Sequence, residues 1–187
     1  MKSGNLKTIK INLKKFEDAH LDSDCKGQFE FGCAINGFYD GTALGPIIVP
    51  CLPMVECNKC GAVQYIPEFN YFLEQIIADK LVSSRGILSK RQIKFLRQHF
   101  DLTQEELGNL LNTDKHEISK MESLRSTRVM QPEKQIVMKI KFAKLLKIKR
   151  AEVLYDIADP TDEEVKIKPD WFPQEKDVRE FLKKKVG

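Results

Sequence analysis

The chain has 187 residues, enough for one large domain or two small ones, and its hydrophobic content of 42% is sufficient to build a core. No apolar run approaches the ~18 residues that a membrane-spanning helix needs, and the basic N-terminus lacks the apolar stretch of a signal peptide, so we expect a cytoplasmic protein without a membrane partner. The net charge is −2 over residues 1–84, +9 over residues 85–150 and −3 over residues 151–187, which predicts that the middle segment binds a polyanion.

The N-terminal part, residues 1–67, is predicted to be a small β-rich domain. Short β-type patterns occur at Thr8–Leu13, Gln28–Phe31 and Ala62–Ile66. The stretch Asn36–Gly41 holds an Asn-Gly and an Asp-Gly dipeptide, which together predict a hairpin turn. Gly45-Pro46, Pro50 and Pro53 then punctuate the chain. A small domain with so few apolar residues often needs a bound metal ion to stabilise its fold.

From Pro67 the apolar spacing becomes helical. Residues 68–86 are predicted to be a connecting helix and a linker, with a break at Ser83–Gly86. Residues 87–155 are predicted to be an all-α domain, and residues 156–187 a C-terminal tail without an assigned role. The predicted fold class is therefore α+β.

Start signals divide the helical domain into short helices. Ser89 is a candidate N-cap for Lys90–His99, and Thr103 forms a capping box with Glu106. Asp114 is expected to cap a third helix, and Pro132 to begin a fourth. Further short helices are predicted at Arg150–Ala158 and Glu175–Lys185.

Five cysteines without a secretion signal are more typical of metal ligands or buried thiols than of disulfides. Cys57-Asn-Lys-Cys60-Gly61 has the spacing of half a zinc site, and Zn²⁺ requires four ligands. The remaining candidates are Cys25, Cys33, Cys51 and His20. A hairpin would bring Cys25 and Cys33 opposite the knuckle, so the expected ligands of a structural zinc ion are Cys25, Cys33, Cys57 and Cys60.

The stretch LTQEELGNLLNTDKHEISKME (Leu102–Glu122) has the pattern of two short helices joined by a tight turn. Ile118 and Met121 are predicted to face the core, which leaves an exposed polar stripe on the second helix. In such a motif the second helix enters the DNA major groove, where Lys and His donate to guanine. The alternative is a helical bundle with a merely solvated charged face. The expected DNA-contacting residues are Gln104, Lys115, His116, Ser119, Lys120, Arg125 and Arg128.

These residues carry a family resemblance. The stretch 102–123 resembles the Xre/Cro-type helix-turn-helix, and IIVPCLPMVECNKCGA (47–62) followed by LSKRQIKFLRQHF (88–100) is similar to antitoxins of the MqsA type with a YgiT-like zinc finger. The resemblance covers about residues 36–150 and implies a homodimer, a toxin partner for the N-terminal domain and base contacts by His116 and Lys120. Of the two C-x2-C pairs of that family, this chain has only the second.

The predicted function is a DNA-binding transcriptional repressor that recognises a palindromic operator as a homodimer. The favoured role is the antitoxin of a type II toxin–antitoxin system, and the alternative is a regulator of a phage or mobile element without a toxin. No nucleophile–base pair, paired carboxylates or phosphate loop is evident in the sequence, so we do not expect an enzyme.

Overall fold

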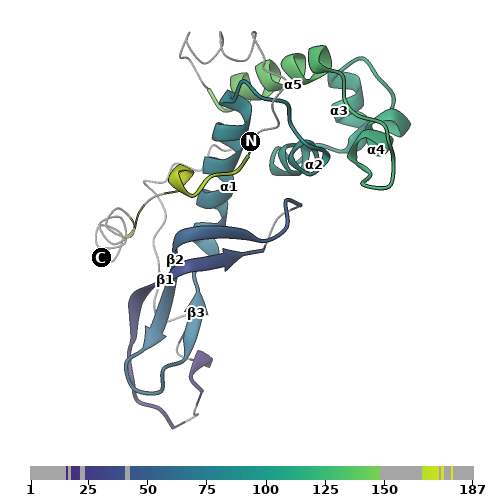
Figure 1. The fold of residues 1–187 in the computed structure, drawn as a ribbon. Helices are drawn as coiled ribbons and strands as arrows, with labels where there is room; N and C mark the ends of the chain where they lie inside the picture. Colours follow the sequence, from purple (N-terminus) through teal and green to yellow (C-terminus); the bar gives the residue numbers. More distant parts are fainter. Residues whose placement is uncertain are drawn as a thin grey trace. The chain divides into compact units, whose positions relative to one another are not determined.

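The computed structural model describes residues 16, 18–21, 24–40, 43–147, 166–172, 174 and 178. The chain divides into two compact units, and the division falls within the first helix (Figure 1). The first unit contains the β-sheet, and the second contains the remaining helices. The strand predicted at Thr8–Leu13 and the helix predicted at Arg150–Ala158 lie outside the described residues, as does the helix predicted at Glu175–Lys185 apart from Val178.

The first unit is built on an antiparallel sheet of strands β1 (Phe29–Tyr39), β2 (Ile47–Cys57) and β3 (Val63–Tyr65), with β2 in the centre. The register places Phe29 opposite Cys57 and Tyr39 opposite Ile47. On β2 the side chains of Val49, Cys51 and Val55 are fully buried, while that of Ile48, next to Val49, is half exposed. This alternation is that of a strand with one face in a core. A 3-10 turn, η3 (Pro169–Trp171), also belongs to this unit.

The hairpin predicted from Asn36–Gly41 is present between β1 and β2, but only the second turn dipeptide, which starts at Asp40, follows the end of β1. Asn36 and Gly37 lie inside β1, and the connection to β2 begins only after Tyr39. Asn36 keeps the positive φ of 51° that the Asn-Gly pattern favours, but it lies opposite Pro50, which has no N–H to donate. Asn36 therefore keeps its turn conformation within β1, at a position where the hydrogen-bond ladder between β1 and β2 is interrupted.

Two prolines lie within the central strand, where proline is unusual. Pro50 and Pro53 precede the stretch of β2 that pairs with β3, which runs only from Met54 to Glu56. Pro50 lies at the interrupted position of the β1–β2 ladder, opposite Asn36. Pro53 is three residues further on, so its backbone nitrogen points to the other edge of β2, where the described part of the sheet supplies no neighbour for residues 47–53. The prolines that punctuate the sequence therefore lie inside a strand.

Within its described residues the second unit contains five helices in part or whole: α1 (Pro67–Ser83), α2 (Lys90–His99), α3 (Gln104–Leu110), α4 (Lys115–Glu122) and α5 (Pro132–Leu145). The predicted starts are confirmed. Ser89, Thr103 and Asp114 each accept a backbone N–H with their side chain, and Pro132 occupies the first turn of α5. The α+β fold, a sheet domain followed by a helical region, is confirmed.

The helical core is apolar and well covered. Leu96 of α2, Leu107 of α3, Ile118 of α4 and Phe142 of α5 are fully buried. Each such side chain contributes about 1.5–3 kcal/mol by leaving water. Phe142 stacks on Phe100 with ring centroids 4.4 Å apart. Among the described residues no helix is both long and apolar enough to span a bilayer.

Candidate metal centre and nucleic-acid interface

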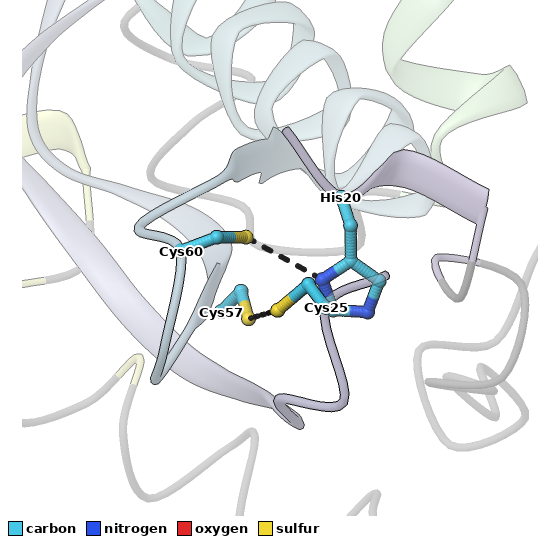
Figure 2. A group of neighbouring side chains, drawn as sticks. All are labelled: His20, Cys25, Cys57 and Cys60. Atoms are coloured by element: carbon cyan, nitrogen blue, oxygen red, sulfur yellow. Dashed lines mark hydrogen bonds between the residues drawn. The ribbon is translucent and has the colours of Figure 1, made fainter. Parts of the chain in front are cut away.

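Four potential metal ligands meet beside the start of the sheet. The Nδ1 or Nε2 atom of His20 and the Sγ atoms of Cys25, Cys57 and Cys60 all lie within 4.8 Å of one another, and Figure 2 shows these side chains converging. The Sγ atoms of Cys25 and Cys57 are 3.7 Å apart, and the Sγ of Cys60 lies 3.5 Å from Nδ1 of His20. The four residues come from two chain segments, one before β1 and one that begins with the last residue of β2.

These spacings match the edges of a tetrahedron around a zinc ion. With Zn–S bonds of about 2.3 Å and Zn–N bonds of about 2.0–2.1 Å, tetrahedral geometry places two sulfurs ~3.8 Å apart and a sulfur and a nitrogen ~3.6 Å apart. The two short contacts in the cluster agree with both values. One His and three Cys form a donor set typical of structural zinc sites. The cluster therefore fits a closed, four-coordinate metal site.

Two glycines, Gly61 and Gly27, allow the backbone to bring the cysteines together. Gly61 has a φ of +69° and its N–H donates to the carbonyl of Cys57 at 3.0 Å, which folds the segment 57–61 into a knuckle. On the other side Gly27 donates its N–H to the Sγ of Cys25 at 3.3 Å. A Cβ on Gly27 would collide with the Sγ of Cys57. The two segments can approach only because this position carries no side chain.

Asn58 joins the knuckle to the sheet. Its Oδ1 accepts the Gln28 N–H at 3.1 Å, its own N–H donates to the Gln28 carbonyl at 3.0 Å, and its Nδ2 donates to Glu30 at 2.9 Å. These three bonds fix Cys57 and Cys60 relative to the chain that carries Cys25. The site is therefore positioned by the sheet as well as by its own turn.

The thiols differ in acidity. A hydrogen bond with His20, supported by the amides of Ala62 and Leu21, lowers the pKa of Cys60 to about 6. The Gly27 amide is the largest influence on Cys25 and lowers its pKa, but burial and the neighbouring thiols of Cys57 and Cys60 outweigh it and leave that pKa raised. Cys60 is thus already a thiolate at neutral pH, the form that binds metals.

The expected ligand set is corrected at one position. Cys33 is not in the cluster; it is disulfide-bonded to Cys51, with a Cα–Cα distance of 5.4 Å. Cys57 lies opposite Phe29, whereas Cys33 lies four residues further along β1, a distance of ~13 Å. The expectation that the cysteines would not form disulfides is therefore wrong for Cys33 and Cys51.

His20 takes the fourth place. The sequence offered it as a candidate, but the hairpin expected to bring Cys25 and Cys33 opposite the knuckle favoured Cys33. The feature of the sequence that could have excluded Cys33 was the face of the sheet on which it lies. Cys33 and Cys51 lie on the same face of a long antiparallel pair, which makes each the other's natural partner.

The second candidate site is the face of α4. Ile118 and Met121 are buried, as the sequence predicted, and hold the helix against the core. The polar residues expected to contact DNA on this helix, Lys115, His116, Ser119 and Lys120, are all exposed. Their role as base contacts stays a prediction, but their side chains are accessible to a ligand.

The angle between α3 and α4 is set by a close backbone approach. A Cβ on Gly108 would lie 2.7 Å from the carbonyl oxygen of Thr113, a distance that real side chains do not tolerate. The N–H of Thr113 donates to the Gly108 carbonyl at 2.9 Å, and Asn112 adopts a positive φ of 50°. The turn is therefore tight enough to fix the direction in which α4 presents its exposed face.

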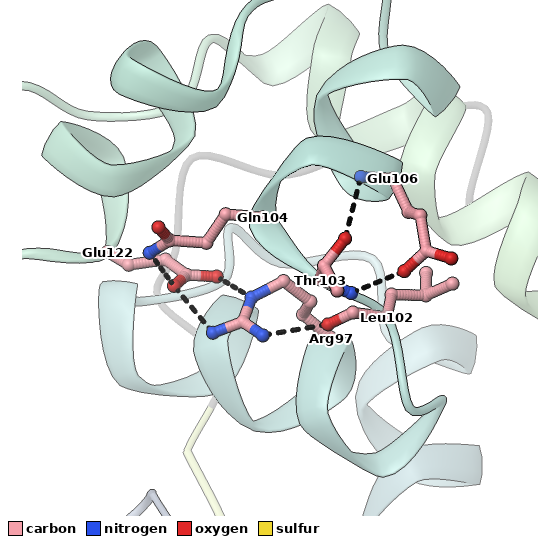
Figure 3. A network of polar contacts seen from close by, with 6 residues as sticks. All are labelled: Arg97, Leu102, Thr103, Gln104, Glu106 and Glu122. Carbon is pink, nitrogen blue, oxygen red and sulfur yellow. Dashed lines mark hydrogen bonds and ion pairs between the residues drawn. The ribbon is translucent and has the colours of Figure 1, made fainter.

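A buried ionic network braces the same helices (Figure 3). Glu122, at the end of α4, is 6% exposed and accepts two hydrogen bonds from Arg97 of α2, at 2.6 and 2.9 Å. Gln104 of α3 donates to the same carboxylate at 3.0 Å. Arg97 also donates to the Leu102 carbonyl at 2.8 Å. Three helices are thus held by one carboxylate.

Two polar residues have structural partners that the sequence did not reveal. The amide nitrogen of Gln104 binds Glu122, so its expected phosphate contact stays a prediction. The second is Lys90 at the start of α2, whose ammonium donates to the carbonyls of Ser123 and Ser126. Lys90 therefore holds the loop after α4.

Arg125 and Arg128 lie in that loop and are exposed. Arg128 donates to Glu117 of α4 at 3.2 Å, and Lys120 donates to the same carboxylate at 3.0 Å. These hydrogen bonds, that of Lys120 first, lower the pKa of Glu117 below its ordinary value. The acid on the exposed face is thus ionised and paired with two cations.

No family model, curated protein or solved structure matches the chain. The fold and the sites define a protein with an N-terminal three-stranded sheet, a His/Cys tetrad suited to a metal ion and a helical region of five helices.

Proposed function

We propose that this protein is a sequence-specific DNA-binding transcriptional repressor that acts as a homodimer on a palindromic operator. The observation that carries the proposal is α4: four polar side chains lie exposed while Ile118 and Met121 anchor the helix in the core. A helix fits the major groove, about 12 Å wide, and Lys and His side chains donate to the acceptors of guanine there.

The surroundings of α4 support the same proposal. Arg125 and Arg128 follow the helix and are exposed, so they can contact phosphates on either side of a groove. The segment 85–150 has a net charge of +9, which favours approach to DNA before any base is contacted. Because one such unit covers few base pairs, high selectivity requires a second copy related by two-fold symmetry.

The direct test removes the two central side chains. His116→Ala combined with Lys120→Ala is expected to abolish selective binding to a duplex enriched by the wild-type protein from a random library. The thermal unfolding curve should be unchanged because both side chains are exposed. Lys141→Ala, a substitution of an exposed lysine on α5, is the matched control. A double variant that still discriminates the enriched duplex from mixed-sequence DNA in a gel-shift assay at fixed salt would contradict the proposal.

We further propose that the tetrad holds a structural zinc ion. The donor set and the spacing support zinc, and with four protein ligands no position remains for a substrate. The bound ion would tie the segment before β1 to the knuckle after β2. When bound it would supply folding free energy rather than reactivity.

Metal analysis tests the zinc assignment on protein purified without added zinc. Wild-type protein and Cys33→Ser are expected to carry one equivalent per chain, because Cys33 lies outside the tetrad. Cys60→Ser and His20→Ala are expected to lose most of it. Wild-type protein with under about a tenth of an equivalent would contradict the assignment.

Within the proposed repressor function, the more specific proposal is that the protein is the antitoxin of a toxin–antitoxin pair. It is supported by the motif residues described above and by the division into a sheet unit and a helical unit, which allows one unit to bind a protein while the other binds DNA. The expected observation is a small toxic gene product encoded next to this chain and neutralised by co-expression of the full chain. If the neighbouring gene is not toxic, the regulator of a phage or mobile element is favoured instead.

A further inference from the structure

Glu117 is an acid in the middle of the exposed face of α4. Its Oε1 accepts from the Lys120 ammonium at 3.0 Å, and its Oε2 accepts from Nε of Arg128 at 3.2 Å. One carboxylate thus bridges a base-contacting candidate on the helix and a phosphate-contacting candidate in the following loop. Its own N–H donates to the capping side chain of Asp114 at 2.8 Å, so its position on the helix is fixed.

The carboxylate is more covered than the cations it binds. The side chain of Glu117 is 24% exposed, against 59% for Lys120 and 65% for Arg128. The two cations are therefore more accessible to a ligand than the acid to which they are paired. A DNA phosphate that approaches either cation must compete with an anion already in place.

We propose that Glu117 sets the sequence selectivity of the DNA-binding face by occupying Lys120 and Arg128 until base contacts on a matching duplex displace it. The inference rests on the proposed DNA-binding function. Non-specific affinity comes almost entirely from cations that neutralise phosphates and release counterions. Pairing with Glu117 weakens that contribution on every sequence. On the matching duplex, hydrogen bonds to base edges offset the cost of breaking the pairs.

The proposal predicts an unusual gain of function. Glu117→Gln removes the competing charge and frees both cations for phosphates. Affinity for mixed-sequence duplex DNA should rise about tenfold at low salt, and the slope of log K against log salt should steepen by about 1–2, because up to two more counterions are released. Affinity for a duplex enriched by the wild-type protein should rise less. The ratio of the two affinities should therefore fall by about three- to tenfold.

A matched control separates this effect from a change of net charge. Glu133→Gln removes the same charge from an exposed position in the first turn of α5. It is expected to leave the salt slope unchanged and to alter the affinity for mixed-sequence DNA by less than about twofold. An equal effect of the two substitutions would overturn the proposal.

A second background tests whether Glu117 acts through its two partners. In a chain carrying Lys120→Met and Arg128→Met, adding Glu117→Gln should change neither the affinity for mixed-sequence DNA nor the salt slope. If Glu117→Gln still raises the affinity there, the acid simply repels DNA and the proposal is wrong. If the wild-type chain shows no salt-dependent binding to any duplex, the proposed function fails with it. If the wild-type chain binds DNA but Glu117→Gln changes neither the affinity for mixed-sequence DNA nor the salt slope, the selectivity proposal is wrong and the proposed function still stands.

Discussion

Glu122 shows how a charged residue can lie inside the helical core. Its side chain and that of Arg97 are only 3% and 11% exposed, and they form a bidentate pair. Burying two charges costs several kcal/mol, which their mutual attraction offsets only while both partners and their hydrogen bonds are in place. Gln104 and the Leu102 carbonyl complete that set.

Replacing one member of the Arg97–Glu122 pair should therefore destabilise the protein more than replacing both. Arg97→Met is expected to lower the free energy of unfolding by about 3 kcal/mol, because it leaves the Glu122 carboxylate buried and unpaired. The double variant Arg97→Met with Glu122→Leu should recover at least half of the loss. Urea unfolding followed by circular dichroism measures both. If the losses of unfolding free energy caused by Arg97→Met and by Glu122→Leu simply add in the double variant, this account of the network is wrong.

Lys139 presents the opposite case, a buried cation without a carboxylate. It is 3% exposed and its ammonium donates to the carbonyls of Ser84 and Gly86, at 2.8 and 2.6 Å. Burial lowers its pKa to about 8. The unfolded chain therefore holds the proton at pH values where the folded chain has released it, between about pH 8 and the ordinary lysine value near 10.4.

This difference fixes the sign of a pH dependence. The stability of the wild-type protein should rise relative to Lys139→Met, by about 1 kcal/mol from pH 7.5 to pH 9.5, because the cost of a buried charge disappears through this window. Below pH 7.5 the gap should be constant, and there the variant should be less stable by about 1–3 kcal/mol through its unpaired carbonyls. Urea titrations of both proteins at several pH values check this; a gap that narrows with rising pH would refute it.

At the scale of elements, the turn between α3 and α4 determines where the candidate DNA-contacting residues point. Gly108 allows the backbone of Thr113 to approach to a distance that any side chain would block. The capping residues Thr103 and Asp114 then start each helix at a defined position. The direction of α4 is therefore a consequence of one missing Cβ and two caps.

Gly108→Ala should accordingly lower stability by about 1–3 kcal/mol, although alanine is the better helix former. It should also reduce DNA affinity, because α4 must rotate to relieve the contact with the Thr113 carbonyl. Asn109→Ala, an exposed substitution at the next position of the same helix, is the control and should be neutral or slightly stabilising. Thermal unfolding and gel-shift assays together separate the two positions.

On the scale of the whole molecule, the two units carry separate candidate sites. The His/Cys tetrad lies in the first unit, and α4 with its buried network lies in the second. A metal ion would contribute its free energy to the unit that contains its ligands.

Metal removal should therefore loosen one unit and spare the other. After zinc-loaded protein is treated with a strong chelator, we expect the ellipticity at 222 nm to stay within about a tenth of its starting value, because the long helices do not depend on the ion. Proteolysis should become faster between residues 24 and 66. Binding to mixed-sequence DNA should persist, and its loss together with the helical signal would show that the units are not independent.

The helical half of the fold could be predicted from local chemistry. Ser89, Thr103, Asp114 and Pro132 specify helix starts through hydrogen bonds and backbone angles within a few residues of each other. The 3.6-residue spacing of Ile118 and Met121 fixed which side of α4 is buried. Such information lies within one or two turns of chain, so no distant contact is needed to interpret it.

The sheet and the fourth member of the candidate metal site were decided by tertiary structure. Pro50 and Pro53 suggest breaks locally, yet both fit in β2: Pro50 lies at the one interrupted position of the β1–β2 ladder, and the nitrogen of Pro53 points to the edge without a described neighbour. The sequence favoured Cys33 over His20 as a ligand, but the β1–β2 register places Cys33 ~13 Å from the knuckle and beside Cys51. The sequence by itself therefore determined the helices, the exposed face of α4 and the metal-binding half at Cys57 and Cys60. Which residues complete the tetrad depended on strand pairing between positions far apart in the chain, where register and not local preference sets the neighbours.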